Sequence, residues 1–82
     1  MNLQSKRVLQ YMVLVQPINP LLSWKEVGVY RLAARIHDLR QLGFPILDRW
    51  KKLKNKYGEP VRVKEYFIKD KTTARLLWEK LL

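Results

Sequence analysis

The sequence contains no cysteine and a single histidine, so disulfide bonds, zinc fingers and thiolate catalysis are excluded. No carboxylate pair, Ser–His set or phosphate-binding loop has a plausible catalytic spacing, and we expect no enzyme activity, no cofactor and no metal. The longest apolar run is five residues, 11–15, whereas a membrane span needs about 20. We therefore expect a cytoplasmic protein without a membrane partner.

Acidic residues are scarce as well. The 82 residues include 7 Asp and Glu against 17 Lys and Arg, which gives a formal net charge of +10. With 48% hydrophobic residues the chain is too apolar for a disordered basic tail, and its length suits one domain. A folded body with this charge indicates a polyanionic partner, which is nucleic acid or, less often, an anionic membrane.

Two helices are expected near the start of the chain. Apolar residues at helical spacing predict a helix over 5–15 with Ser5 as its N-cap. Asn19 followed by Pro20 is a typical helix start and predicts a second, short helix. Gly28 is expected to end this helix, because glycine adopts a left-handed backbone without a steric penalty.

The second half of the chain changes from helical to alternating periodicity. Residues 47–54 and 61–68 are rich in alternating, β-branched and aromatic residues and predict a β-hairpin with a longer loop. A final helix is expected after the hairpin, capped by Thr72 or Thr73.

The second helix and a third helix, expected over 30–42, are joined by a short turn that contains glycine. This pattern indicates a helix-turn-helix, whose second helix enters the major groove of DNA. The buried face of the third helix is expected to carry Leu32, Ile36 and Leu39. Side chains on its other faces, such as Gln41, are therefore free to contact DNA. In the major groove, an Arg side chain can form two hydrogen bonds to guanine, an Ala side chain can contact the methyl group of thymine, and an Asp side chain can accept a hydrogen bond from the amine of cytosine. Asp can instead orient a neighbouring Arg on the same helix. The candidate base contacts are Tyr30, Arg31, Ala34, Arg35, His37 and Asp38.

A basic hairpin that follows a helix-turn-helix is a wing, which contacts the DNA backbone or the minor groove. Residues 44–71 carry nine Lys and Arg against four acidic residues, so the hairpin is the most basic part of the chain. Such contacts supply affinity and register more than sequence information. The candidate wing contacts are Lys51, Lys52, Lys54, Lys56, Tyr57, Arg62 and Lys64.

Three prominent residues are assigned to structure. We expect Arg40 to have a structural role, because it lies near the buried side of its helix. We expect Trp24 and Trp50 to lie in the core, because large aromatic residues dominate small cores.

The stretch VGVYRLAARIHDLRQLGFPI, residues 27–46, closely resembles the winged helix-turn-helix domain common in small phage and prophage proteins. The resemblance continues through Trp50, the Asn55–Gly58 turn and the Val61–Val63 strand, and it covers about residues 5–68.

This resemblance implies an α+β fold, a winged helix-turn-helix with a three-helix core and a β-hairpin wing. It also implies double-stranded DNA as the partner, with Tyr30, Arg31 and Arg35 on the recognition helix. We therefore expect a DNA-binding domain over 1–71 and an extra C-terminal helix over 72–82.

The extra helix is apolar on one side and can lie either on its own domain or on a second copy. A winged helix normally closes its core without such a helix, so we expect a homodimer that binds two half-sites. The candidate dimerisation residues are Leu77, Trp78, Leu81 and Leu82.

The expected function is sequence-specific binding of double-stranded DNA by a small phage-type transcriptional regulator at the nucleoid of a bacterium or an infected host. Two alternatives remain open. One is an excisionase-like architectural factor that bends DNA, and the other is an anti-repressor or inhibitor that binds a phage or host protein.

Overall fold

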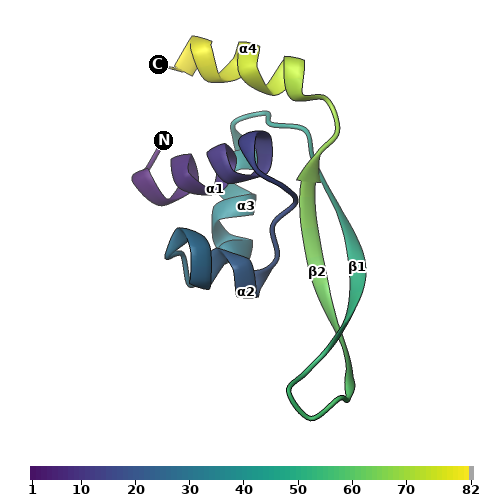
Figure 1. Cartoon of the computed structure of the whole chain (residues 1–82). Helices are drawn as coiled ribbons and strands as arrows, with labels where there is room; N and C mark the ends of the chain where they lie inside the picture. The colour runs from purple at the N-terminus through teal and green to yellow at the C-terminus, as the bar shows by residue number, and fades with distance from the viewer. Residues whose placement is uncertain (82) are drawn as a thin grey trace.

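The computed structural model describes residues 1–81 and has an α+β architecture (Figure 1). The helical segments that precede the hairpin form one body, the hairpin stands beside this body and projects beyond it, and the last helix crosses the opposite end next to the first helix. The molecule is elongated, 45 × 22 × 20 Å along its principal axes. The elements are α1 (Leu3–Leu14), α2 (Pro20–Leu22), η1 (Ser23–Val27), α3 (Leu32–Gln41), β1 (Ile46–Lys54), β2 (Pro60–Ile68) and α4 (Lys71–Leu81).

Helix α1 begins two residues earlier than predicted. The side chain of Asn2 accepts a hydrogen bond from the Ser5 amide at 2.7 Å, so Asn2 is the N-cap. Ser5 is instead buried inside the first turn. The prediction of Ser5 as the cap was wrong because the helix starts one turn earlier, where the side-chain oxygen of Asn2 accepts from the amide of Ser5 itself.

The predicted start of the second helix is confirmed. Asn19 accepts a hydrogen bond from the Leu22 amide at 2.9 Å, and Pro20 occupies the first helical position. The chain continues from α2 into the π-helical turn η1, which Gly28 ends with a left-handed φ of 74°. The buried Ser23 hydroxyl donates to the Val29 carbonyl at 2.6 Å and fixes the turn that leads to α3.

Helix α3 begins at Leu32. Tyr30 and Arg31 were predicted to lie within this helix, but they precede it. Val29 is held in the turn by hydrogen bonds with Ser23, and at Arg31 the backbone (φ −100°, ψ 70°) has not yet become helical. Within the helix, Leu32, Ile36 and Leu39 form the buried face as predicted.

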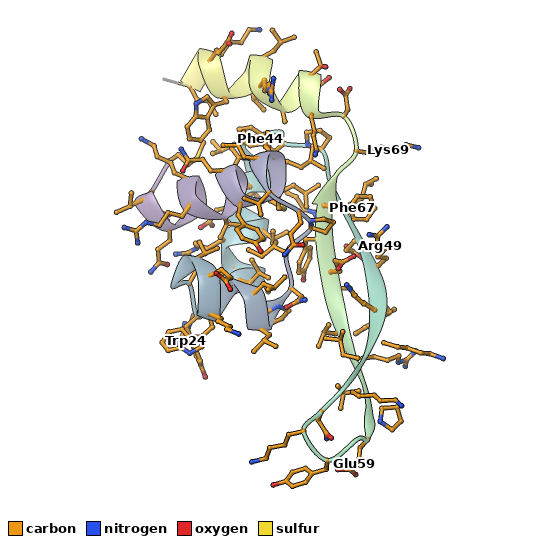
Figure 2. The ribbon with its side chains drawn as sticks, in the orientation of Figure 1. Trp24, Phe44, Arg49, Glu59, Phe67 and Lys69 are labelled. Atoms are coloured by element: carbon orange, nitrogen blue, oxygen red, sulfur yellow. The ribbon has the colours of Figure 1, made fainter. Side chains whose placement is uncertain are left out.

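The core lies between α1, α3 and the base of the hairpin. It contains mostly aliphatic side chains, with Phe44 and Tyr66 as its buried aromatic residues (Figure 2). Trp24 and Trp50 are 61% and 60% exposed, so their prediction as core residues was wrong. Trp24 lies on the solvent side of η1, and Trp50 lies on the part of the hairpin beyond the helical body, where no core is present to receive a side chain.

The hairpin pairs residue by residue from Ile46 with Ile68 at its base to Lys54 with Pro60 near its tip. Ile18 extends this sheet locally, because its amide donates to the Tyr66 carbonyl at 2.9 Å and its carbonyl accepts from the Tyr66 amide at 2.7 Å. The buried hydrophobic residues of both strands lie at this base, so the packing of the body anchors only one end of the hairpin.

Helix α4 is capped by Asp70, which accepts a hydrogen bond from the Thr73 amide at 3.0 Å and another from the Thr73 hydroxyl. The prediction of a threonine cap was therefore wrong, because the Asp70 carboxylate reaches the free amides of the first turn. These hydrogen bonds, from the Thr73 hydroxyl first and then its amide, lower the pKa of Asp70. Ala74 is buried, and Leu77 and Trp78 pack against the core.

Candidate nucleic-acid interface

The outer side of α3 carries an exposed stripe that begins just before the helix. Tyr30, Ala33, His37 and Gln41 are all exposed and are spaced three to four residues apart. His37 Nε2 and Gln41 Nε2 lie 3.4 Å apart. We call these four residues the α3 stripe. Arg31, which precedes the first turn of α3, is also exposed.

The other flank of α3 faces α1. The Arg35 guanidinium donates to the Gln4 side-chain oxygen at 3.1 Å and lies 3.1 Å from the Asp38 carboxylate. Ala34, Arg35 and Asp38 are each half-buried. Of the six predicted base contacts, the structure therefore leaves Tyr30, Arg31 and His37 exposed and half-buries the other three, of which Arg35 contacts α1 through Gln4. Sequence periodicity locates the buried face of a helix, but it does not show which flank a neighbouring helix covers.

An exposed aromatic pair lies at the entrance to α3. The rings of Trp24 and Tyr30 meet edge to face with centroids 5.7 Å apart, and Figure 2 shows Trp24 at the end of the helical body remote from α4. The two side chains support each other outside the core, which explains why two large aromatic residues remain ordered on the surface. Trp24 could not be predicted as a surface residue, because its position on a helical turn also suits a core role.

Arg40 connects α3 to the base of the wing. Its guanidinium donates to the Ile46 carbonyl at 3.2 and 3.0 Å and to Asp48 at 2.8 Å, so its predicted structural role is confirmed. The hydrogen bond from Arg40 lowers the pKa of Asp48, with further charge interactions from Lys64 and Arg40. The guanidinium also lies 5.8 Å from the Tyr66 ring centroid, on the face of the hairpin that meets the body.

The two faces of the wing differ in character. Because side chains alternate along a strand, the face that carries Tyr66 at the base continues outwards through every second residue. We call this the inner wing face. On it, the Trp50 ring lies between Arg62 and Lys64, whose charged groups are each 5.4 Å from the ring centroid. The residues of the inner wing face are Trp50, Lys52, Lys54, Arg62 and Lys64.

On the opposite, outer wing face both cations are paired with one carboxylate. Glu65 is only 4% exposed there and forms ion pairs with Arg49 at 2.7 Å and with Lys51 at 3.4 Å. Burial alone would raise the pKa of Glu65, but the hydrogen bonds from Arg49 and Lys51 outweigh burial and the pKa is lowered. Arg49 also lies 4.5 Å from the Phe67 ring centroid, and Figure 2 shows both residues on the hairpin.

Lys51 is therefore on a different face from the other strand lysines predicted to contact DNA. Lys56 and Tyr57 lie at the tip of the wing, with the ammonium 5.0 Å from the exposed ring, and belong to neither face. The tip is held by Asn55, whose side-chain oxygen accepts from the Tyr57 amide at 2.9 Å and the Glu59 amide at 3.0 Å.

The α3 stripe and the inner wing face border the same open side of the molecule. Arg40 lies on the flank of α3 next to this stripe and contacts both Asp48 and Tyr66, the base of the inner wing face. A three-helix body, a turn closed by a left-handed glycine and a hairpin beside the last core helix together form a winged helix-turn-helix. A family model described as a winged helix-turn-helix domain matches residues 3–71.

The chain belongs to this family. Winged helix-turn-helix domains are a DNA-binding, non-enzymatic kind of domain, so the predicted fold and the DNA-binding class are confirmed. The match ends where α4 begins, so α4 is nearly all outside the shared domain. No curated protein and no solved structure matches the chain significantly. Phage origin and dimerisation stay predictions, and Leu82 lies outside the described residues.

Two further observations concern residues 1–81. These residues contain no group of three or more His, Asp or Glu side chains placed to hold a metal ion. None of the helices they form combines the length and the apolar character needed to cross a membrane.

Proposed function

We propose that this protein is a sequence-specific regulator that binds double-stranded DNA, with the α3 stripe in the major groove and the inner wing face along the backbone or minor groove. The observation that carries the proposal is that the two surfaces border one open side. Helix α3 has ten residues, and its diameter with side chains, about 10–12 Å, fits a major groove about 12 Å wide. Acting on duplex DNA places the protein at the nucleoid.

The side chains of the α3 stripe suit base recognition. Gln41 carries an amide that can bond bidentately to adenine, and His37 beside it offers a ring donor or acceptor. Arg31, at the entrance to α3, can bond bidentately to guanine, and each good pair discriminates by about 1–3 kcal/mol. Ala33 leaves room for close approach to a thymine methyl group. In this arrangement Arg35 acts mainly in packing, because Gln4 and Asp38 hold its guanidinium.

The test is selection of bound duplexes from a random library, followed by footprinting of the enriched site. The full chain should enrich one motif, and His37→Ala and Gln41→Ala should each relax the preference at particular base pairs. Arg35→Ala is the matched control from the same helix and should leave the motif unchanged. An unchanged motif in both stripe variants, together with a motif altered by Arg35→Ala, would refute the assignment of the stripe.

The footprint also separates the regulator from the excisionase-like alternative. One isolated site, with or without two-fold symmetry, supports a regulator. Adjacent, cooperatively filled sites with bent DNA would favour the architectural role. A chain that retards no duplex at moderate salt would contradict the proposed function altogether.

A further inference from the structure

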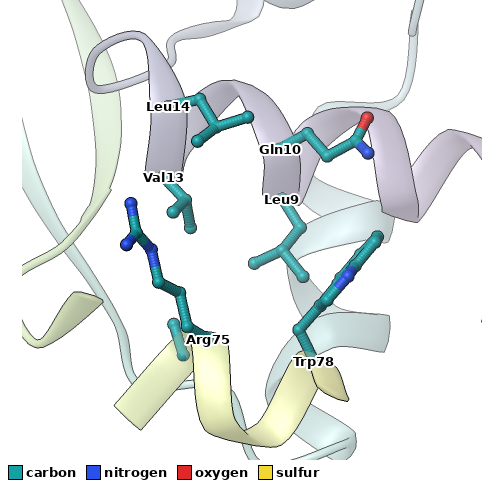
Figure 3. A pocket seen from close by; sticks show the side chains of 7 residues that line it. Leu9, Gln10, Val13, Leu14, Arg75 and Trp78 are labelled. Carbon is teal, nitrogen blue, oxygen red and sulfur yellow. The ribbon is translucent and has the colours of Figure 1, made fainter. Parts of the chain in front are cut away.

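Helices α1 and α4 enclose an apolar groove (Figure 3). The groove has a volume of about 140 Å³. Figure 3 shows Arg75 and Trp78 extending from α4 towards α1, with the apolar side chains of α1 facing the space between them. The lining residues are Leu9, Gln10, Val13, Leu14, Ala74, Arg75 and Trp78.

This groove has the size and the lining to receive one side chain from another molecule. An apolar cavity of about 150 Å³ accepts a group the size of benzene, which is comparable to a leucine or phenylalanine side chain. Leu14 at the rim is 68% exposed, so the apolar lining continues from the groove onto the surface. An exposed helix pair with an apolar groove is the surface on which an amphipathic helix docks.

The two helices that form the groove carry an excess of positive charge. Helix α1 carries Lys6 and Arg7 and no acidic residue. Arg75 lines the groove, and of the other charged residues of α4 only Glu79 is acidic. Charge complementarity therefore favours an occupant with acidic side chains around its apolar anchor, since matching potentials speed encounter and select partners.

A second copy of the chain fits this face poorly. Two copies would bring the same cationic helices together, each on a chain of net charge +10. A face made of two helices, each about 18 Å long, covers roughly 400 Å², whereas a stable dimer buries about 800 Å² per partner. A single helix laid in a groove requires less surface than a dimer does.

We propose that the α1/α4 groove binds an acidic amphipathic helix of a partner protein, with one apolar anchor seated between Arg75 and Trp78. None of the residues that line the groove belongs to α3 or to the hairpin. Partner and DNA can therefore be bound at the same time. The inference stands on the groove itself and does not depend on DNA binding.

The probe is a synthetic helical peptide of about 16 residues with leucines at i, i+3, i+4 and i+7 and mostly glutamates elsewhere. Its control is the same peptide with lysine in place of glutamate. Amide NMR of the full chain should show shifts centred on α1 and α4 with the glutamate peptide and none with the lysine peptide. Shifts confined to α3 and the hairpin would overturn the proposal, because they would show only attraction to the basic DNA interface.

Two matched pairs of variants locate the site. Leu14→Ser removes apolar surface from the groove without changing its charge and should weaken peptide binding about tenfold, while Leu76→Ser, at a similarly exposed α4 position outside the groove, should not. Arg75→Glu should weaken binding more than Lys80→Glu, which makes the same change of charge outside the lining. Equal effects within each pair would overturn the proposal.

Analytical ultracentrifugation tests whether a second copy of the chain occupies the groove. The chain should remain a monomer at concentrations where the peptide binds. A dimer that Leu14→Ser disrupts and Leu76→Ser does not would show that a second copy fills the groove, and would overturn the proposed partner. Adding duplex DNA should leave peptide binding within about twofold, since the two sites do not overlap.

Discussion

Replacing Lys52 by alanine removes one cation from the inner wing face, and replacing its neighbour Lys51 removes one from the outer face. Lys52 is paired across the strands with Arg62, on the side that continues towards α3. Lys51 instead lies 3.4 Å from Glu65, whose carboxylate already balances it. If DNA lies along the inner wing face, the two variants must differ although their charge change is the same.

The magnitude follows from counterion release. Each phosphate contact contributes about 0.9 to the slope of log affinity against log salt concentration. Lys64 already lies 3.7 Å from the Asp48 carboxylate, so the three other cations of the inner wing face contribute about 2.7. Between 50 and 200 mM salt these three contacts weaken binding on the order of 40-fold. Lys52→Ala should flatten the slope by about 0.9, and Lys51→Ala should leave it nearly unchanged.

Fluorescence anisotropy with a labelled duplex, titrated at several salt concentrations, measures both slopes. Thermal unfolding followed by circular dichroism is the control, because neither exposed lysine should contribute much to stability. If the two variants flatten the salt slope equally, the division of the wing into an inner face that contacts DNA and an outer face whose cations pair with Glu65 is refuted. A larger effect of Lys51→Ala would place the DNA on the outer face.

Three further variants test the parts that position α3 and α4. Ser23→Ala leaves the buried Val29 carbonyl without its side-chain donor and should lower the free energy of unfolding by about 1–3 kcal/mol in urea titrations. Gly28→Ala meets no atom within 4 Å but must adopt a φ of 74°, so the same titrations should show a loss of about 1–2 kcal/mol, and Gly28→Asn a smaller one. Asp70→Ala should speed amide hydrogen exchange in α4. Because the pKa of Asp70 is lowered in the folded chain, its stabilisation is present above its ordinary value of 3.8 and is lost as the pH falls below it. The difference between Asp70→Ala and the parent should therefore shrink progressively as the pH falls below 3.8, and a difference that stays constant throughout the acid titration would contradict the capping role of the carboxylate.

Local signals in the sequence were sufficient for most of the fold. Asn19 and Pro20 mark a helix start through hydrogen bonding and a fixed φ, and Gly28 marks its end, because these effects act within one turn of the chain. Leu32 and Ile36 identify the buried face of α3 for the same reason. Such features require no knowledge of what packs nearby.

The parts of the site that could not be predicted depend on long-range packing. Arg35 is turned away from the open side by Gln4, a residue far away in sequence, and no periodicity within α3 contains that contact. The sequence places Glu65 among many lysines of the hairpin, and only the strand register shows that Lys51 is the lysine with which it pairs. Trp50 suits a core by composition, yet the hairpin carries it beyond the core.

The attachment of the hairpin at one end has a mechanical consequence. The bridge between Ile18 and Tyr66 and the buried base residues fix where the wing leaves the body, while the distal strands are held by their own ladder and by contacts among their own side chains. A free two-stranded ribbon is marginally stable and twists easily, so local opening should cost progressively less towards the tip. The width of a minor groove varies with DNA sequence. Adjusting the twist of the distal wing to that width would leave the packing around Tyr66 undisturbed, so the compliance of the ribbon can accommodate different grooves without loosening the core.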